Sequence, residues 1–126
     1  MDPNAITTQF TDHYYQLFGS GQRANMRSLY HADSSLSFEG TQFNGPDAII
    51  GKLTTLAFQQ VAVQCISRDW LPGPNNCLVI MVNGSMQLPG EANKLKFSQC
   101  FTLVAQAGNN FYLKNDLFRC VVSPPP

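Results

Sequence analysis

The second half of the chain carries four long segments rich in β-branched and aromatic residues, and this feature constrains the fold more than any other. Such residues favour the pleated, half-buried surface of a β-strand. Turn-forming stretches separate the segments and read PGPNN, PGEAN and AGNN. The spacing predicts four antiparallel strands that follow one another as a meander, at residues 61–71, 76–88, 94–107 and 110–122.

The first half has the periodicity of helices. Within residues 4–18 the apolar positions fall on one helical stripe, at Ile6, Phe10, Tyr14, Leu17 and Phe18. Asp2 or Asn4 is a candidate N-cap, and Pro3 suits the first turn. Two more helices are predicted at residues 23–30 and 45–56, with a brief strand at 35–40 between them. Helices first and strands last predict an α+β fold, in which a curved, mainly antiparallel sheet packs on three helices.

Both faces of this sheet carry apolar side chains. Along residues 94–107 one parity holds Leu95, Phe97, Phe101 and Leu103, whereas the other includes Cys100 and Val104. The helices can cover only one face, and a chain of this length has no second layer for the other face. A homodimer that buries the outer face is therefore expected.

Length and charge limit the class of protein. A chain of 126 residues suits one domain, which we place at residues 1–122, before a Pro-rich tail at 123–126. Eight Lys and Arg balance eight Asp and Glu, and no basic cluster occurs, so nucleic-acid binding is disfavoured. No stretch approaches the roughly 18 consecutive apolar residues of a membrane span, so membrane insertion is not expected.

The cysteines indicate a reducing compartment. Cys65, Cys77, Cys100 and Cys120 are widely spaced and form no C-x-x-C pair. The N-terminus MDPNAITTQF lacks the basic and apolar pattern of a signal peptide. We therefore expect reduced thiols buried in strands, rather than disulfides or a zinc site, and a location in the cytosol or nucleus.

Few residues are of the kind that carries catalysis or binds metal. The two histidines, His13 and His31, have no partners at metal-ligand spacing, so neither a metal nor a cofactor is expected. Asp69 and Asp116 lie in predicted strands, and an acid in a pocket of the sheet could be a general base, whereas Asp116 could instead simply pair with a backbone group or an arginine. An enzyme would need one of these acids to face a closed cavity, with Tyr14 or His13 within hydrogen-bond reach.

The pair Phe38–Glu39 is the least ordinary polar feature. Strands are depleted in Glu, and a carboxylate among aromatic residues must be solvated, paired or used. An aromatic side chain beside an acid at a strand end forms an apolar socket with a charged rim. Such a socket suits a partner's aromatic residue flanked by Lys or Arg.

Several motifs, taken in order, resemble the nuclear transport factor 2 family, and they span residues 2–120. They read HYYQLF, SLSFEG, IIGKLTTLAFQQ, LPGEANKLKFSQ and FYLKNDLFR. The residues in these motifs are most similar to those of plant members of the family. The resemblance implies a cone-like fold of three helices on a strongly bent sheet that dimerises through its outer face. It also implies a non-catalytic carrier that binds Ran in its GDP form and Phe-x-Phe-Gly nucleoporins, in the cytoplasm and nucleus and at the nuclear pore.

The resemblance assigns positions to these roles. The apolar socket for an aromatic residue of Ran would consist of Phe38, Leu56, Val61, Leu95 and Phe118. Acidic groups of the rim would be Glu39 and Glu91, and the dimer face would include Met81, Cys100 and Leu117.

Four departures from the family pattern bear on partner binding. Many members carry tryptophan where Phe38 stands. The loop PGEANK keeps a single acid, Glu91, where members usually have more, and FGSGQR lacks the acids common after the first helix. An N-terminal aromatic that some members use for nucleoporin repeats is replaced by Pro3 and Asn4. Fewer acids predict weaker attraction to a basic partner.

Two alternatives stay open. The first is a divergent paralogue that acts as a scaffold for Phe-containing linear motifs, as related domains of RNA-export and stress-granule proteins do. The second is a dehydratase or isomerase, since the same cone fold serves such enzymes; this analogy rests on the fold alone.

Overall fold

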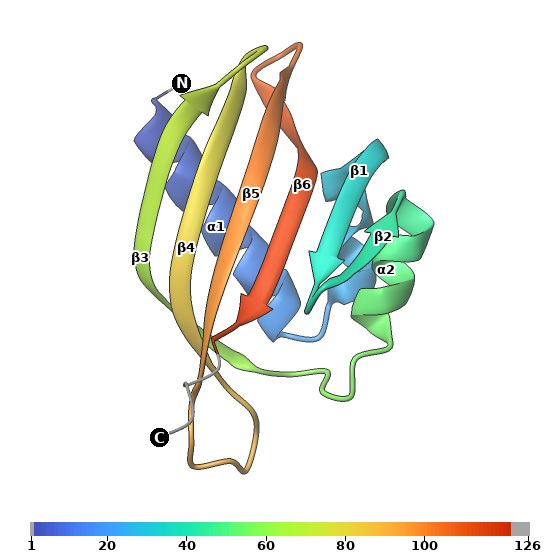
Figure 1. Cartoon of the computed structure of the whole chain (residues 1–126), viewed down its shortest axis with the longest axis vertical. Coiled ribbons are helices and arrows are strands. Elements are labelled where there is room, and N and C mark those ends of the chain that lie inside the picture. The colour runs from blue at the N-terminus through green and yellow to red at the C-terminus, as the bar shows by residue number, and fades with distance from the viewer. Residues whose placement is uncertain (1, 122–126) are drawn as a thin grey trace.

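The computed structural model describes residues 2–121, so the Pro-rich tail at 123–126 lies outside the described residues. Along the chain the elements are α1 (Pro3–Gly19), the 3₁₀ helix η1 (Arg23–Leu29), β1 (Tyr30–Phe38), β2 (Thr41–Asn44), α2 (Pro46–Thr54), β3 (Ala62–Gly73), β4 (Cys77–Gln87), β5 (Leu95–Gln106) and β6 (Asn110–Cys120) (Figure 1). The α+β class and the four-strand meander are confirmed.

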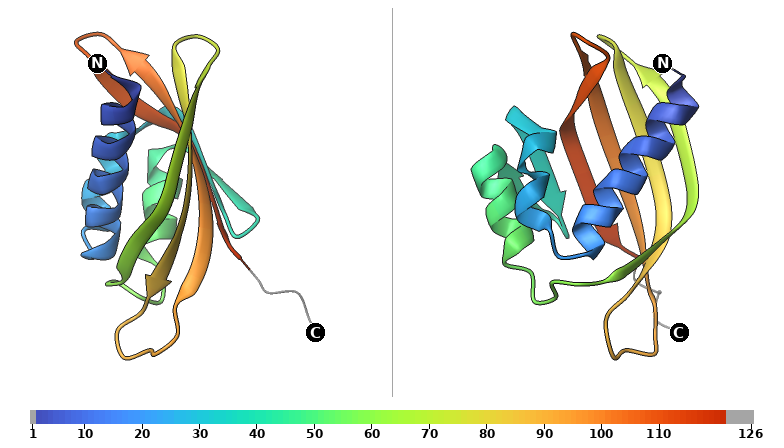
Figure 2. Two further views of the ribbon diagram at one scale, coloured as in Figure 1. Left: turned by 90° about the vertical axis from the view of Figure 1, so that its left-hand side faces the viewer. Right: turned by 180° about the vertical axis from the view of Figure 1, so that it is seen from behind.

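The six strands form one sheet in the order β2-β1-β6-β5-β4-β3. All neighbours pair antiparallel except β1 and β6, which pair in parallel. The three helices lie on the concave side of the curved sheet, and the opposite face is left uncovered by the described residues (Figure 2).

The helices begin and end where their residues favour it. Asp2 is the N-cap of α1 and Pro3 occupies the first turn, whereas Asn4, the other candidate, accepts a 2.6 Å hydrogen bond from the Trp70 indole. In α2, Asp47 lies in the first turn and Lys52 in the last, which matches the helix dipole at both ends.

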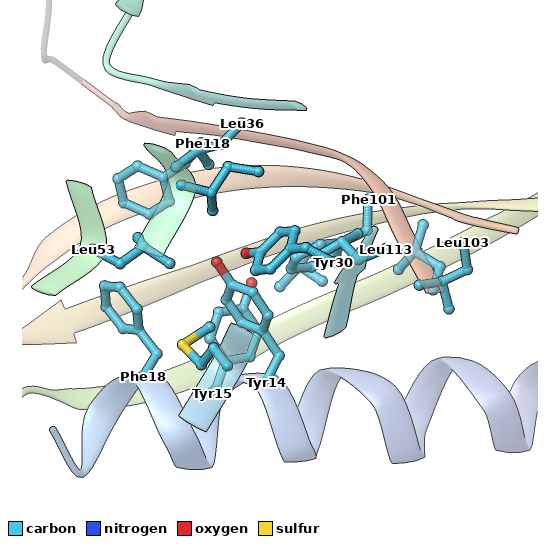
Figure 3. Close-up of a cluster of buried hydrophobic side chains, with 14 of the residues drawn as sticks. Tyr14, Tyr15, Phe18, Tyr30, Leu36, Leu53, Phe101, Leu103, Leu113 and Phe118 are labelled. Carbon is cyan, nitrogen blue, oxygen red and sulfur yellow. The ribbon is translucent and has the colours of Figure 1, made fainter. Parts of the chain in front are cut away.

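The core lies between α1 and the inner face of the sheet (Figure 3). Tyr14 and Phe18 of α1 are each 2% exposed, and Phe97 and Phe101 of β5 are 1% and 0% exposed. The odd-numbered parity of β5 is the buried one from Phe97 to Leu103, as the alternation predicts. Leu95 shares that parity but is 49% exposed at the first position of the strand.

The sequence did not predict the β1–β2 hairpin. The predicted strand at residues 35–40 is the end of a longer strand that starts at Tyr30, and β2 follows after two residues. These two, Glu39 and Gly40, have φ angles of 52° and 89°, the positive values that primed two-residue hairpin turns require. Glu39 therefore lies in a turn and not inside a strand.

Three observations concern the cysteines, metal binding and membrane insertion. The four cysteines are free thiols in strands, but each is half-buried and not fully buried. Within residues 2–121 no group of three or more His, Cys, Asp or Glu side chains is arranged to hold a metal ion. None of the described helices is both long and apolar enough to cross a membrane.

Candidate functional site

The seven positions assigned to the socket and rim lie at one end of the sheet, the lower end in Figure 1. This lower end consists of the last residues of β1, β4 and β6, the first residues of β5, and the loops at residues 55–61 and 88–94. Segments far apart in the chain meet here because β1 and β6 run in parallel and end together.

An aromatic stack forms the centre of the lower end. Phe38 of β1 is paired in register with Phe118 of β6, and their rings stack at 4.8 Å with an interplanar angle of 8°. Phe118 in turn stacks on Phe97 at 5.5 Å. The Lys52 ammonium lies 5.6 Å from the centre of the Phe38 ring, within cation–π range. Phe118 is 5% exposed, whereas Phe38 is half-buried and accessible from outside.

Glu39 is exposed and holds the ends of two strands together. Its carboxylate accepts a 2.5 Å hydrogen bond from the backbone N–H of Cys120, and its own N–H donates to the Phe118 carbonyl at 3.2 Å. Burial, followed by the nearby Glu39 charge, raises the pKa of the Cys120 thiol. Glu39 is therefore an exposed acidic residue and also a structural hydrogen-bond acceptor.

Val61 and Glu91 border a shared open depression of about 490 Å³. Val61 is 5% exposed, and its N–H donates to the Gly19 carbonyl at the end of α1. A Cβ on Gly19 would lie 2.7 Å from the Val61 carbonyl oxygen, so only glycine permits this close approach. Leu56 packs against the core from the loop after α2, and Glu91 is exposed in the β4–β5 loop.

A buried polar network lies between α1 and the sheet, and the sequence did not predict it as a unit. Asp116 of β6 is 1% exposed and accepts hydrogen bonds from the hydroxyls of Tyr14 at 2.8 Å and Tyr30 at 2.9 Å. The Gln99 side-chain amide donates to the other carboxylate oxygen of Asp116 at 2.7 Å, and the Tyr15 hydroxyl donates to the side-chain oxygen of Gln99. Figure 3 shows the three tyrosines converging on this region.

The network contains the Tyr14–Asp116 pair that an enzyme would need, but protein groups already occupy the carboxylate of Asp116. Both carboxylate oxygens of Asp116 are occupied by protein donors, and the side chain is buried. Burial raises the pKa of Asp116, and the three hydrogen bonds oppose that rise. The second candidate base, Asp69, is exposed on the outer face, and His13 is exposed on α1. Asp116 is thus a satisfied core carboxylate.

The outer face carries the three residues assigned to the dimer interface in a single row. Met81 pairs with Cys100, and Cys100 pairs with Leu117, across β4, β5 and β6. Met81 and Leu117 are 48% and 54% exposed. An apolar hollow of about 280 Å³ borders this row beside Leu71, which is 73% exposed. Within residues 2–121 no helix covers these side chains.

A further groove, missed by sequence reasoning, runs between α1 and the β5–β6 hairpin. It measures about 430 Å³; its apolar walls are Ile6, Phe10, Leu103 and Phe111, and its polar rim is Gln9, His13, Asn109 and Asn110. Because α1 and this hairpin are adjacent only in the folded structure, periodicity along the chain gave no signal for the groove.

Comparison with known proteins decides the family. Residues 6–120 match the Nuclear transport factor 2 (NTF2) domain. The chain belongs to the nuclear transport factor 2 family. It is 41% identical to Nuclear transport factor 2B of Arabidopsis thaliana, over 94% of each chain. It is 44% identical to Nuclear transport factor 2 of Schizosaccharomyces pombe, over 94% of this chain and 95% of that one. Among solved structures, nuclear transport factor 2 from Cryptosporidium parvum superposes with a TM-score of 0.86 at 37% identity, over 94% of each chain. These similarities support a role in nuclear transport.

Proposed function

We propose that this chain is a non-catalytic nuclear transport factor that binds Ran in its GDP form and Phe-x-Phe-Gly nucleoporins. It would act as a homodimer in the cytoplasm and nucleus, concentrated at the nuclear pore. Membership of the nuclear transport factor 2 family supports the transport role, since the named relatives are transport factors.

The observation that carries the Ran assignment is the aromatic stack at the lower end with an acid beside it. Phe38 presents a half-buried ring that is held by stacking on the buried ring of Phe118, and Glu39 follows Phe38 directly at the hairpin turn. Leu56, Val61 and Leu95 would complete the apolar contact, and Glu91 would add a second negative charge. Aromatic anchors with a few flanking charges provide most of the binding energy in many interfaces.

Substitution of Glu39 tests this assignment. In Glu39→Gln, an amide oxygen can still accept from the Cys120 N–H, so only the charge is lost; in Glu39→Lys, the charge is reversed and the acceptor is lost. We expect affinity for Ran–GDP to fall about tenfold in the first variant and about a hundredfold in the second. Isothermal titration calorimetry at fixed salt measures both, and circular dichroism melting checks that the variants are folded. Wild-type affinity in folded Glu39→Lys would contradict the assignment.

A scaffold for Phe-containing linear motifs is the second candidate, and the groove along α1 favours it. Its walls include two phenylalanines and its polar rim offers amide groups to a peptide backbone, a common composition for a peptide-binding groove. The groove is separate from Glu39, so the two functions respond to different substitutions.

A pull-down with Ran–GDP, Ran–GTP and Phe-Gly peptides distinguishes the candidates. If the groove holds the peptide, Phe111→Ala weakens peptide binding while Glu39→Lys does not. If this chain is a Ran carrier, Ran–GDP is retained in preference to Ran–GTP, and Glu39→Lys releases it.

A further inference from the structure

Arg23 is the only buried lysine or arginine within residues 2–121. It begins the 3₁₀ helix η1 and is 1% exposed. The ion pairs of the described residues all involve other side chains, so no carboxylate neutralises the Arg23 guanidinium. Burial of a charge is costly unless other groups compensate for it, so the surroundings of Arg23 must supply that compensation.

Main-chain carbonyl groups take the place of a carboxylate. The Arg23 Nε donates to the Phe18 carbonyl at 3.1 Å, and Nη1 donates to the carbonyls of Leu53 at 3.4 Å and Phe58 at 2.5 Å. Phe18 and Leu53 belong to the last turns of α1 and α2. Carbonyls at the end of a helix lack intrahelical partners and carry the negative end of the helix dipole. The ends of two helices therefore converge on one guanidinium.

Two phenylalanine rings complete the surroundings of this side chain. The guanidinium carbon of Arg23 lies 4.2 Å from the centre of the Phe18 ring and 4.9 Å from that of the Phe58 ring. A guanidinium is planar, offers five N–H donors and stacks on aromatic faces, whereas the ammonium of a lysine is a compact donor at the end of a flexible chain. Three carbonyls and two rings around one group therefore require arginine, and lysine cannot make all of these contacts.

The contact between Arg23 and Phe58 holds a loop that has few other polar attachments. Residues 55–61 join α2 to β3 and form part of the lower end. Among the described residues, the N–H groups of residues 56–60 donate to no main-chain carbonyl, and the Phe58 carbonyl accepts from Arg23 alone. The next attachment is the Val61 N–H, which donates to the carbonyl at the end of α1 at 3.0 Å. The middle of the loop therefore depends on Arg23 for its position.

We propose that Arg23 is a positioning residue for partner binding at the lower end. It fixes the 55–61 loop against the ends of α1 and α2, and it thereby holds the Leu56 side chain in the position that the apolar socket requires. This inference rests on the proposed Ran binding, because Leu56 is one of the socket positions. It adds to that proposal a residue that acts from inside the molecule, since Arg23 is itself too deeply buried to contact a partner.

Ran–GDP affinity and proteolysis of the loop test the proposal in the full chain. Arg23→Lys keeps the charge but loses the planar set of donors, so isothermal titration calorimetry should show about tenfold weaker binding. The first cut by chymotrypsin in the native variant should fall after Phe58, because the loop opens locally. The control is Ile80→Ala, a buried position in the upper half of β4, which removes core packing. It should change Ran–GDP affinity less than about twofold and show no preference for cleavage after Phe58.

A double-mutant cycle separates positioning from a general loss of stability. In the otherwise wild-type protein, Leu56→Ala and Glu39→Gln should each weaken Ran–GDP binding about tenfold. In Arg23→Lys the loop is already displaced, so Leu56→Ala should cost less than about twofold more, whereas Glu39→Gln should still cost about tenfold. If Arg23 only stabilised the fold, both substitutions would cost the same in either background.

Phe58→Leu provides a milder variant in case Arg23→Lys does not fold. It keeps the carbonyl that accepts from Arg23 and removes one of the two rings that flank the guanidinium. The same pattern is expected at a smaller size, with Ran–GDP binding about threefold weaker and a smaller effect of Leu56→Ala.

Three results would overturn the proposal: wild-type Ran–GDP affinity in folded Arg23→Lys, a loss no larger than that in Ile80→Ala, or full additivity with Leu56→Ala. If the wild-type chain itself does not bind Ran–GDP, the proposed function fails, and proteolysis then decides the role of Arg23. A first cut after Phe58 in Arg23→Lys supports positioning of the loop, whereas a cleavage pattern equal to that of the wild type overturns it.

Discussion

At the scale of single residues, the carboxylate of Asp116 is the most consequential group in the core. It accepts from Tyr14 on α1, Tyr30 at the start of β1 and Gln99 on β5, so three elements meet at one side chain. A buried donor left without a partner costs about 1–3 kcal/mol. The network therefore fixes how α1 lies on the sheet.

Substitution of Asp116 should be costly and should change the pH dependence of stability. Asp116→Ala removes the acceptor of three buried hydrogen bonds, although the Gln99 amide keeps its bond to the Tyr14 hydroxyl, and should lower the free energy of unfolding by about 3 kcal/mol. Asp116→Asn keeps one acceptor oxygen and should cost about 1–2 kcal/mol. Urea unfolding followed by circular dichroism measures both; a cost below about 0.5 kcal/mol for Ala would contradict a satisfied network.

The sign of the pH effect follows from the direction of the pKa. Because burial raises the pKa of Asp116 above its unfolded value of 3.8, the folded protein binds the proton more tightly. Asp116 therefore adds stability as pH falls from neutral through its folded pKa, and that contribution is complete below the unfolded value. The stability gap between wild type and Asp116→Asn should widen on acidification. If this stability difference narrowed on acidification instead, the hydrogen bonds to Asp116 would outweigh burial in setting its pKa.

Residue identity alone revealed only part of the site. Phe38–Glu39 stood out in the sequence because a carboxylate beside an aromatic is unusual in a strand-like run. Lys52 did not stand out, since a lysine in the last turn of a helix is an ordinary complement to the helix dipole. Its position over Phe38 depends on how α2 lies against β1, which the local sequence does not encode.

At the scale of elements, strand periodicity predicted the meander well and the hairpin poorly. Strands β3 to β6 have 11 or 12 residues each and clear turn signals between them. β2 has four residues, and its Glu-Gly turn lacks the Asn or Asp that usually marks such a hairpin. The parallel pairing of β1 with β6 joins the beginning and the end of the sheet, and no local pattern contains that information.

Gly84 in β4 shows how closely two elements approach. A Cβ at this position would lie 2.4 Å from the Gln64 carbonyl oxygen on β3 and 2.8 Å from the Phe97 ring on β5. Gly84→Ala should therefore lower the free energy of unfolding by about 2–3 kcal/mol through overpacking.

The matched control is Gly51→Ala in α2, where a Cβ would meet no atom within 4 Å. Alanine is preferred over glycine inside a helix, so this variant should gain about 0.5–1 kcal/mol. Thermal melting monitored by circular dichroism compares the two substitutions. Equal melting temperatures would show that β4 can shift to accept the methyl group.

At the scale of the whole molecule, the uncovered outer face supports the homodimer that we propose. The sequence predicted apolar side chains on both faces of the sheet, and within residues 2–121 the helices cover only the concave one. Met81, Cys100 and Leu117 form a row across three strands on the other face. An exposed apolar row of this kind is expected where a second subunit binds.

Leu117→Glu tests the position of that interface. It would place an unpaired carboxylate in a buried contact, which costs several kcal/mol, so we expect a monomer by multi-angle light scattering. Gln16→Glu, at an exposed position on α1, is the control and should leave the mass unchanged. A dimer mass for folded Leu117→Glu would show that the copies meet elsewhere.

The parallel pairing of β1 with β6 has a consequence for synthesis in the cell. The Glu39 carboxylate accepts a hydrogen bond from the Cys120 amide, and the two residues are 81 positions apart in the sequence. Phe38 stacks on Phe118 over a similar separation along the chain. β1 can pair with β2 early, but β6 must leave the ribosome before β1 gains this second neighbour, and contacts between such distant segments form late and slowly. Until then the N-terminal half of the nascent chain lacks the stack of Phe38 on Phe118, so a partner that recognises the lower end can bind only after β6 has joined the sheet.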